Sequence, residues 1–175
     1  MGRNLFYILV MNKVDIVDAE VLGIVVDCLR KGGVVMHPTE TCYGLAVDIF
    51  NKRALEKLYM VKKMALDKPV SILVGSLEMA RKYGEFSRKA LELAEKYWPG
   101  PLSIVVPRRS SLPEFLNPGQ DFVSIRFSSS EFCRKMVLGL GNPVTTTSAN
   151  VSGEYQLYKP DVSGIEGVDL LVDGG

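Results

Sequence analysis

Residues 33–50 read GVVMHPTETCYGLAVDIF and contain two apolar segments joined by a short polar turn. The first segment, 33–38, is almost wholly apolar and stops at a proline, which is typical of a buried strand. The second segment, 43–50, is again extended in pattern. Because a turn rather than a helix joins the two strands, this stretch favours a mixed sheet over a purely parallel one.

Helical and extended patterns alternate along the rest of the chain. Apolar residues at helical spacing predict helices at 18–31, 52–63, 87–98 and 129–141. Apolar runs between turn residues predict strands at 70–75, 102–108, 122–127, 143–147 and 168–173. Strands that alternate with helices in this way predict a single-domain α/β fold, in which helices flank one mixed sheet.

The composition is that of an ordinary globular protein, with 47% apolar and 23% charged residues in a chain of 175. A net charge of +1 excludes a strong overall basic field, so any anion site must be local. The three cysteines are widely spaced, which favours a reducing, cytoplasmic setting over a disulfide framework. A single histidine, His37, excludes a histidine-rich zinc site. No apolar run approaches the ~20 residues of a membrane span.

The N-terminal segment, Leu5–Met11, is an apolar run that follows Arg3. It is short for a signal peptide, and no small-residue cleavage site follows it. We expect residues 1–17 to form a first strand or an extension ahead of the domain. Met11 is an alternative start, which would make residues 1–10 an extension.

Common nucleotide and nucleophile motifs are missing. The sequence has no glycine-rich loop that closes in Gly-Lys-Ser/Thr, and no G-x-S-x-G elbow. Residues 139–144, GLGNPV, contain the first two glycines of a dinucleotide fingerprint, but they precede a strand instead of a helix.

Three polar segments remain as candidates for a site. The first, HPTETCYGL at 37–45, is either a strand-end site for a small polar ligand or a turn whose threonines bond their own backbone. The second, VKKMALDKP at 61–69, is either a lysine-bearing helix end or a cradle for phosphates. The third, TTTSANVSGE at 145–154, carries many short hydroxyl and amide groups, which favours nucleotide or amino-acid recognition over a plain polar loop.

Arg126 belongs with these segments. In the strand VSIRF, alternation places Ser124 and Arg126 on the face opposite Val123 and Ile125. A buried arginine needs an anionic partner, and an internal carboxylate is about as plausible here as a ligand.

A resemblance to a known family rests on these segments and on two more. HPTETCYGL, KPVSILV, YWPGPLSIVVP, SIRF and PVTTTSANVSGE occur in this order. In combination and order they resemble the YrdC-like family, from about residue 18 to the end of the chain. The resemblance implies a twisted mixed α/β sheet with a concave, locally basic face.

The resemblance also implies an activity, that of a threonylcarbamoyl-AMP synthase. Such an enzyme joins L-threonine, bicarbonate and ATP into threonylcarbamoyl-AMP and pyrophosphate, with Mg²⁺ on the phosphates. A transferase complex then passes the carbamoyl-threonine to N6 of adenosine 37 in tRNAs that read ANN codons. The chemistry needs no nucleophilic side chain, because the enzyme positions its substrates and neutralises charge.

Site residues follow from the resemblance position by position. Those implied for L-threonine are Thr39, Thr41, Arg126 and Thr146. Those implied for ATP are Lys62, Lys68, Ser148 and Asn150. No metal ligand from the protein is implied.

Three departures from the family pattern stand out. Met64 occupies a position where the family usually has arginine, and Lys63 is a candidate substitute for the missing charge, although a lysine cannot reproduce the arginine fork. Leu73 stands where many relatives have a histidine near threonine. The chain ends at LLVDGG, so residues 18–175 resemble the family without its C-terminal segment.

Two main alternatives for the function stay open at this point, with a third ranked below them. The chain is either a synthase or a weakly active or inactive relative that binds nucleotide or structured RNA, since a lysine meets phosphate alike in ATP and in RNA. A third reading, a carbamoyl-adenylate enzyme of hydrogenase maturation, ranks last because the zinc-finger cysteines of that class are absent.

Overall fold

The computed structural model describes residues 7–9, 18–161 and 165–174, with backbone only for 7–9. The helices in it are α1 (Ala19–Arg30), α2 (Lys52–Val61), α3 (Leu77–Tyr83), α4 (Arg88–Tyr97) and α5 (Glu131–Leu140). The strands are β1 (Tyr7–Leu9), β2 (Val35–His37), β3 (Gly44–Ala46), β4 (Ser71–Leu73), β5 (Ser103–Pro107), β6 (Phe122–Arg126), β7 (Val144–Ser148) and β8 (Leu170–Val172).

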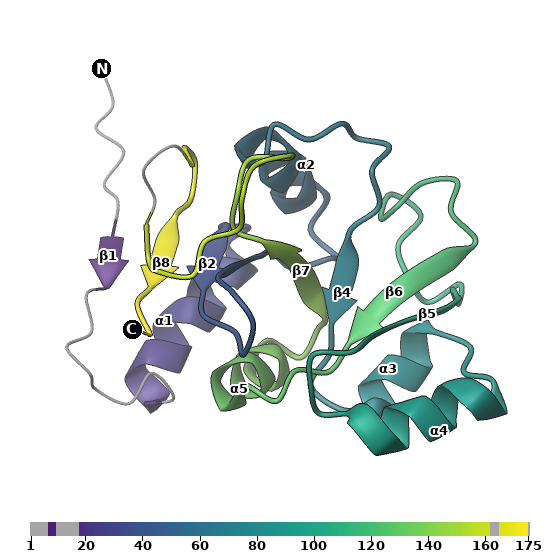
Figure 1. Cartoon of the computed structure of the whole chain (residues 1–175). Coiled ribbons are helices and arrows are strands. Elements are labelled where there is room, and N and C mark those ends of the chain that lie inside the picture. The colour runs from purple at the N-terminus through teal and green to yellow at the C-terminus, as the bar shows by residue number, and fades with distance from the viewer. Residues whose placement is uncertain (1–6, 10–17, 162–164, 175) are drawn as a thin grey trace.

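One mixed sheet organises the chain, in the order β1-β8-β2-β3-β7-β4-β6-β5 (Figure 1). The stretch at 33–50 supplies the antiparallel pair β2–β3, in which Met36 lies opposite Leu45. By contrast, β8 lies parallel to β1 and β2, and β4 lies parallel to β6. The expected mixed α/β sheet is therefore confirmed.

The predicted helices are all present, and their ends follow local capping. Asp18 accepts a hydrogen bond from the Glu20 N–H at 2.8 Å and starts α1, as the sequence indicated. Gly141 ends α5 in the left-handed conformation at φ 82°, which a glycine adopts without strain. The sequence pattern did not predict α3, a short helix capped by Ser76.

Two apolar layers cover opposite faces of the sheet. One core joins Met36, Leu45, Ile72 and Ile125 to α2, α3 and α4. The other joins Val35, Ala46, Leu73 and Val144 to α1 and α5. Since alternate residues of each strand point to opposite faces, both sides of the sheet are used.

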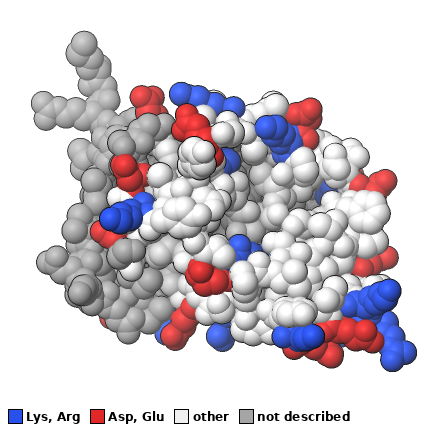
Figure 2. Space-filling model, viewed as in Figure 1, with Lys and Arg blue, Asp and Glu red and all other residues white. Residues whose placement is uncertain are grey.

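Helices α1 and α5 cover only part of their face of the sheet. Beyond α5 the same face continues over β7, β4 and β6, where partly exposed residues such as Thr146, Ser71 and Ser124 replace the apolar ones. Figure 2 shows mostly uncharged residues over the middle of this side of the molecule, with a few Lys or Arg and Asp or Glu atoms among them and more charges of both signs around the rim. The basic character expected for the concave face stays a prediction.

Within the described part of the chain, no helix is both long and apolar enough to cross a bilayer.

Candidate functional site

A polar cavity of about 330 Å³ opens on the uncovered part of the sheet face. Its lining comes from the β2–β3 turn, β3, β6, β7 and the segment after β7. The lining residues are Thr39, Thr41, Cys42, Gly44, Arg126, Thr146, Thr147, Ser148 and Gln156. All four residues implied for threonine therefore line one cavity, together with Ser148, which is one of the residues implied for ATP.

The β2–β3 turn is held together by Thr39. Its hydroxyl accepts hydrogen bonds from the N–H groups of Thr41 and Cys42, at 3.1 and 3.2 Å, and donates to the Cys42 carbonyl at 2.7 Å. The turn thus bonds its own backbone, as one alternative for this segment proposed, and it also lines the cavity. The Thr41 hydroxyl lies 3.0 Å from that of Thr39 and is held at the cavity wall.

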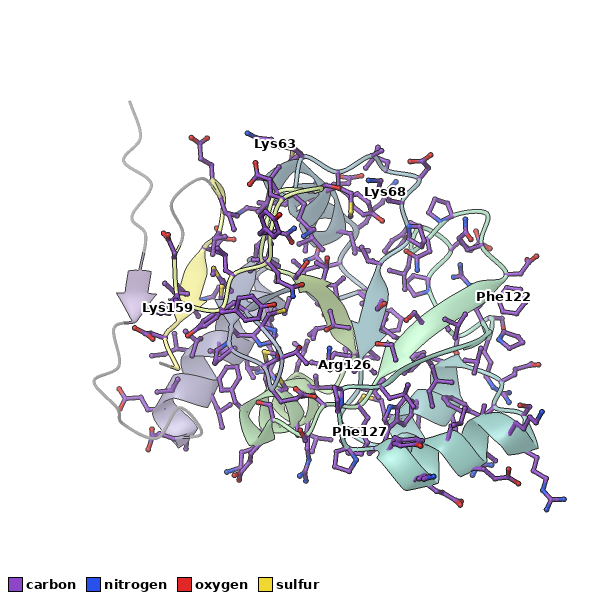
Figure 3. The ribbon with its side chains drawn as sticks, viewed as in Figure 1. Lys63, Lys68, Phe122, Arg126, Phe127 and Lys159 are labelled. Atoms are coloured by element: carbon purple, nitrogen blue, oxygen red, sulfur yellow. The ribbon has the colours of Figure 1, made fainter. Side chains whose placement is uncertain are left out.

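Arg126 reaches the cavity from the end of β6 (Figure 3). One of its terminal nitrogens, Nη2, lies 3.1 Å from a Glu40 carboxylate oxygen and donates to the Thr41 hydroxyl at 3.1 Å. Its Nε–H is buried and has no hydrogen-bond partner among the described residues. Arg126 therefore has the internal carboxylate that one alternative expected, and it also lines a cavity; a ligand for Arg126 stays a prediction.

The W-P-G-P-L segment supports the strand that carries Arg126. Gly100 donates its N–H to the Phe127 carbonyl at 2.8 Å, and the Trp98 ring packs edge-on against the Phe127 ring. A Cβ on Gly100 would lie 2.4 Å from the Tyr97 carbonyl oxygen, so only glycine fits there. The Gly100 hydrogen bond and the Trp98 packing hold the backbone directly after Arg126.

Lys62 contacts the segment at 145–154 and is only 3% exposed. Its ammonium donates to the Ser148 carbonyl at 2.5 Å, the Asn150 carbonyl at 2.9 Å and the Asn150 side-chain oxygen at 3.1 Å. Burial lowers the pKa of Lys62 to about 8. The structure therefore brings together three of the residues implied for ATP. Lys62 holds the loop that carries Ser148 and Asn150.

The remaining residues of the lysine segment differ in exposure. Lys68 is exposed and donates to the Ser152 hydroxyl at 3.1 Å, which ties this segment to the loop after β7. Lys63 is exposed with a φ of 47°, and Met64 is half-buried against the core on the α2 side. Figure 3 places Lys63 and Lys68 beside α2 and above β4, well away from Arg126 in this view.

Two positions noted in the sequence lie beneath the site. Leu73 is buried in the core formed with α1 and α5. His37 is 1% exposed, and burial lowers its pKa to about 4, so the imidazole is neutral at neutral pH. Its Nε2 has no partner among the described residues and lies near Gly44.

Sequence reasoning missed several residues of the site. Cys42, Gly44 and Gln156 line the cavity, and Glu40 binds Arg126. Glu40 and Cys42 lie in the same turn as Thr39 and Thr41. That position was the available sign that they belong to the site. For Gln156 no pattern in the sequence indicated a place at the cavity.

We expect Gly44→Ala to weaken about tenfold the threonine binding that the resemblance implies, while leaving the fold intact. A Cβ there would meet the Thr147 carbonyl oxygen at 3.4 Å and the Thr39 methyl at 3.6 Å, which are ordinary contacts. The added methyl group would take up space in the cavity that Gly44 lines. One methylene more or less in a pocket changes the binding free energy by roughly 1–3 kcal/mol. Calorimetry with threonine and thermal unfolding measure the two effects; Gly23→Ala, which meets nothing within 4 Å, is the control.

The comparison with known families decides where the chain belongs. The Sua5/YciO/YrdC family model, described as "Telomere recombination", matches residues 27–175. The chain belongs to this family. It is 32% identical over 127 residues to threonylcarbamoyl-AMP synthase of Pyrococcus abyssi, and the aligned region covers 72% of this chain and 37% of that protein. It is 34% identical over 132 residues to threonylcarbamoyl-AMP synthase of Vibrio cholerae, covering 74% of this chain and 70% of that protein.

A solved structure of this family shares the fold. The crystal structure of Pyrococcus abyssi Sua5 complexed with L-threonine superposes with a TM-score of 0.85 at 28% identity. The match covers 90% of this chain but only 48% of that protein. The chain therefore spans less than half of the Pyrococcus abyssi relative, and the fold expected from the resemblance is confirmed.

Proposed function

We propose that this chain makes L-threonylcarbamoyl-AMP from L-threonine, bicarbonate and ATP, with release of pyrophosphate. The observation that carries the proposal is the shared cavity of Thr39, Thr41, Arg126 and Thr146, with Ser148 at its edge. Family membership and the names of the two relatives support the same activity.

In the proposed reaction, the threonine amine attacks the carbon of bicarbonate with loss of water, or that of carbon dioxide with loss of a proton, and gives a carbamate. A carbamate oxygen then attacks the α-phosphorus of ATP, and the bond from that phosphorus to the bridging oxygen of pyrophosphate breaks. Arg126 would pair with the threonine carboxylate, since it lines the cavity and its contacts with Glu40 and Thr41 use Nη2 alone. Thr39, Thr41 and Thr146 would hold the amino acid beside it, so that positioning supplies much of the rate.

On the nucleotide side, we propose that Ser148 and Asn150 contact ATP, while Lys62 and Lys68 provide positive charge next to the phosphates. The described residues hold no cluster of three or more His, Cys, Asp or Glu side chains suited to a metal ion. We propose that Mg²⁺ enters on the phosphates of ATP, where it would neutralise charge. The proposed product serves a transferase complex that modifies adenosine 37 of tRNA in the cytoplasm.

The proposal is tested by incubating the chain with ATP, Mg²⁺, bicarbonate and labelled threonine. We expect pyrophosphate and labelled adenylate in equal amounts, and neither without threonine or bicarbonate. If pyrophosphate release does not depend on threonine, the proposed activity is wrong for this chain.

A second candidate is a relative that binds nucleotide or structured RNA without making the adenylate. Two observations favour it: the Lys62 ammonium is already engaged by three protein oxygens, and Met64 offers no charge. Such a protein would bind ATP or tRNA in the absence of threonine and release no pyrophosphate.

We expect Met64→Arg to strengthen ATP binding about three- to tenfold. Met64 follows α2 at the lysine segment, and an arginine there would add a planar two-pronged donor for phosphate. The variant should lose some stability, because Met64 packs against the core. Fluorescence titration with ATP measures the gain. Met60→Arg, at a position 70% exposed on α2, adds the same charge and should change ATP binding little; an equal gain in both variants would contradict a specific role.

A further inference from the structure

Glu40 ties two separate segments of the chain together at the cavity wall. It lies in the β2–β3 turn, and its carboxylate accepts a hydrogen bond from the Ser128 hydroxyl. The Ser129 N–H donates to the same carboxylate at 3.3 Å. The Glu40 side chain is 18% exposed, so the carboxylate is partly withdrawn from water.

Ser128 is itself fixed in place. It is 1% exposed, and its hydroxyl accepts the Ser130 N–H at 3.1 Å just before α5 begins. A hydroxyl has one proton to donate, and here that proton goes to Glu40. The carboxylate is therefore anchored to the start of α5 independently of Arg126.

The anchored carboxylate is also the counter-ion of Arg126. One oxygen of Glu40 lies 3.1 Å from Arg126 Nη2, and this nitrogen also donates to Thr41, the next residue of the turn. Burial raises the pKa of Glu40, but hydrogen bonds from Ser128, from its own backbone and from Arg126 outweigh burial and lower it. The Glu40 carboxyl is thus ionised at neutral pH.

We infer that Glu40 is a positioning residue, which holds the Arg126 guanidinium in place to receive a substrate carboxylate. This inference rests on the proposed function. An arginine side chain that is already ordered loses less rotational freedom when a ligand binds. The contacts of the guanidinium with Glu40 and Thr41 use Nη2 alone, so the guanidinium keeps other donors for a ligand in the cavity that it lines.

A competing role for Glu40 makes the opposite prediction. A carboxylate that merely occupied Arg126 would have to be displaced by threonine, and its neutralisation would then strengthen binding. The anchoring by Ser128 and Ser129 favours positioning, because their hydrogen bonds share the Glu40 charge and keep the carboxylate where it is.

We expect Glu40→Gln to weaken threonine binding about tenfold in calorimetry and to raise the threonine KM similarly, with kcat and the ATP KM changed less than twofold. Glu131→Gln is the matched control, since it removes an acidic group from the start of α5 whose partner is the surface residue Lys135. The control should bind threonine like the unmodified chain. Unchanged or tighter threonine binding by Glu40→Gln would overturn the inference.

A double-mutant cycle separates positioning from a general loss of structure. If Glu40 acts through Arg126, Glu40→Gln has no further effect on threonine binding in an Arg126→Ala background. Ser128→Ala should weaken threonine binding in the same direction as Glu40→Gln, and the two changes together should do no more than Glu40→Gln alone. Additive losses would reject the inference. If the unmodified chain binds no threonine, the proposed function fails instead, so the two failures are distinct.

Discussion

Replacing Arg126 with alanine is expected to weaken threonine binding about 100-fold and to change ATP binding much less. The side chain is 14% exposed, and it is the positive charge of the cavity wall. Losing one partner of a desolvated charge pair costs on the order of 2–5 kcal/mol, and about 1.4 kcal/mol is a factor of ten. Calorimetry with each substrate separately measures the two affinities.

Two further variants define what Arg126 contributes. Arg126→Lys keeps the charge but loses the planar fork, so we expect it to recover only part of the threonine affinity. Arg134→Ala removes a nearby exposed cation that stacks on Phe127, 5.9 Å from the ring centre, and should leave threonine binding unchanged. A loss of ATP binding equal to the loss of threonine binding in Arg126→Ala would contradict the assigned role.

Much of the fold, and the sheet face on which Arg126 lies, follow from local sequence patterns, whereas the residues implied for threonine came from the family resemblance. Alternation in VSIRF placed Arg126 on the face opposite Ile125, and β6 has this arrangement, with Ile125 buried and Arg126 at the cavity. The turn at 33–50 predicted a mixed sheet for the same reason, because residue spacing and turn length are local properties.

Contacts between distant segments could not be predicted in this way. The partner of Glu40, Ser128, lies 88 residues away, and nothing local to either residue indicates the contact. Lys62 is a similar case, because a lysine after a helix is usually a solvated residue that favours the helix dipole. Its burial depends on carbonyls 86 and 88 residues further along the chain, at Ser148 and Asn150.

Lys62→Met is expected to weaken ATP binding about 100-fold and to lower the melting temperature. The change leaves the Ser148 carbonyl and two oxygens of Asn150 without their charged donor. The Ser148 carbonyl would keep the Asn150 N–H and the Asn150 side-chain oxygen would keep the Ser148 hydroxyl, so the Asn150 carbonyl loses most. An unsatisfied buried acceptor costs roughly 1–3 kcal/mol, so the loop that carries Ser148 and Asn150, the residues proposed to contact ATP, would rearrange. Titration with ATP and thermal unfolding measure the two effects. Lys52→Met, at an exposed position on the same helix, is the control and should show neither effect.

The pH dependence of ATP binding tests the same role without a structural change. Because burial lowers the pKa of Lys62 to about 8, raising the pH through 8 removes its proton and its charge. A neutral amine donates fewer hydrogen bonds to the three oxygens, so the affinity for ATP should fall above pH 8. The inflection should disappear in Lys62→Arg, since a guanidinium stays protonated across this range. An inflection near pH 8 that persists in Lys62→Arg would assign the titration to another group and contradict the role of Lys62.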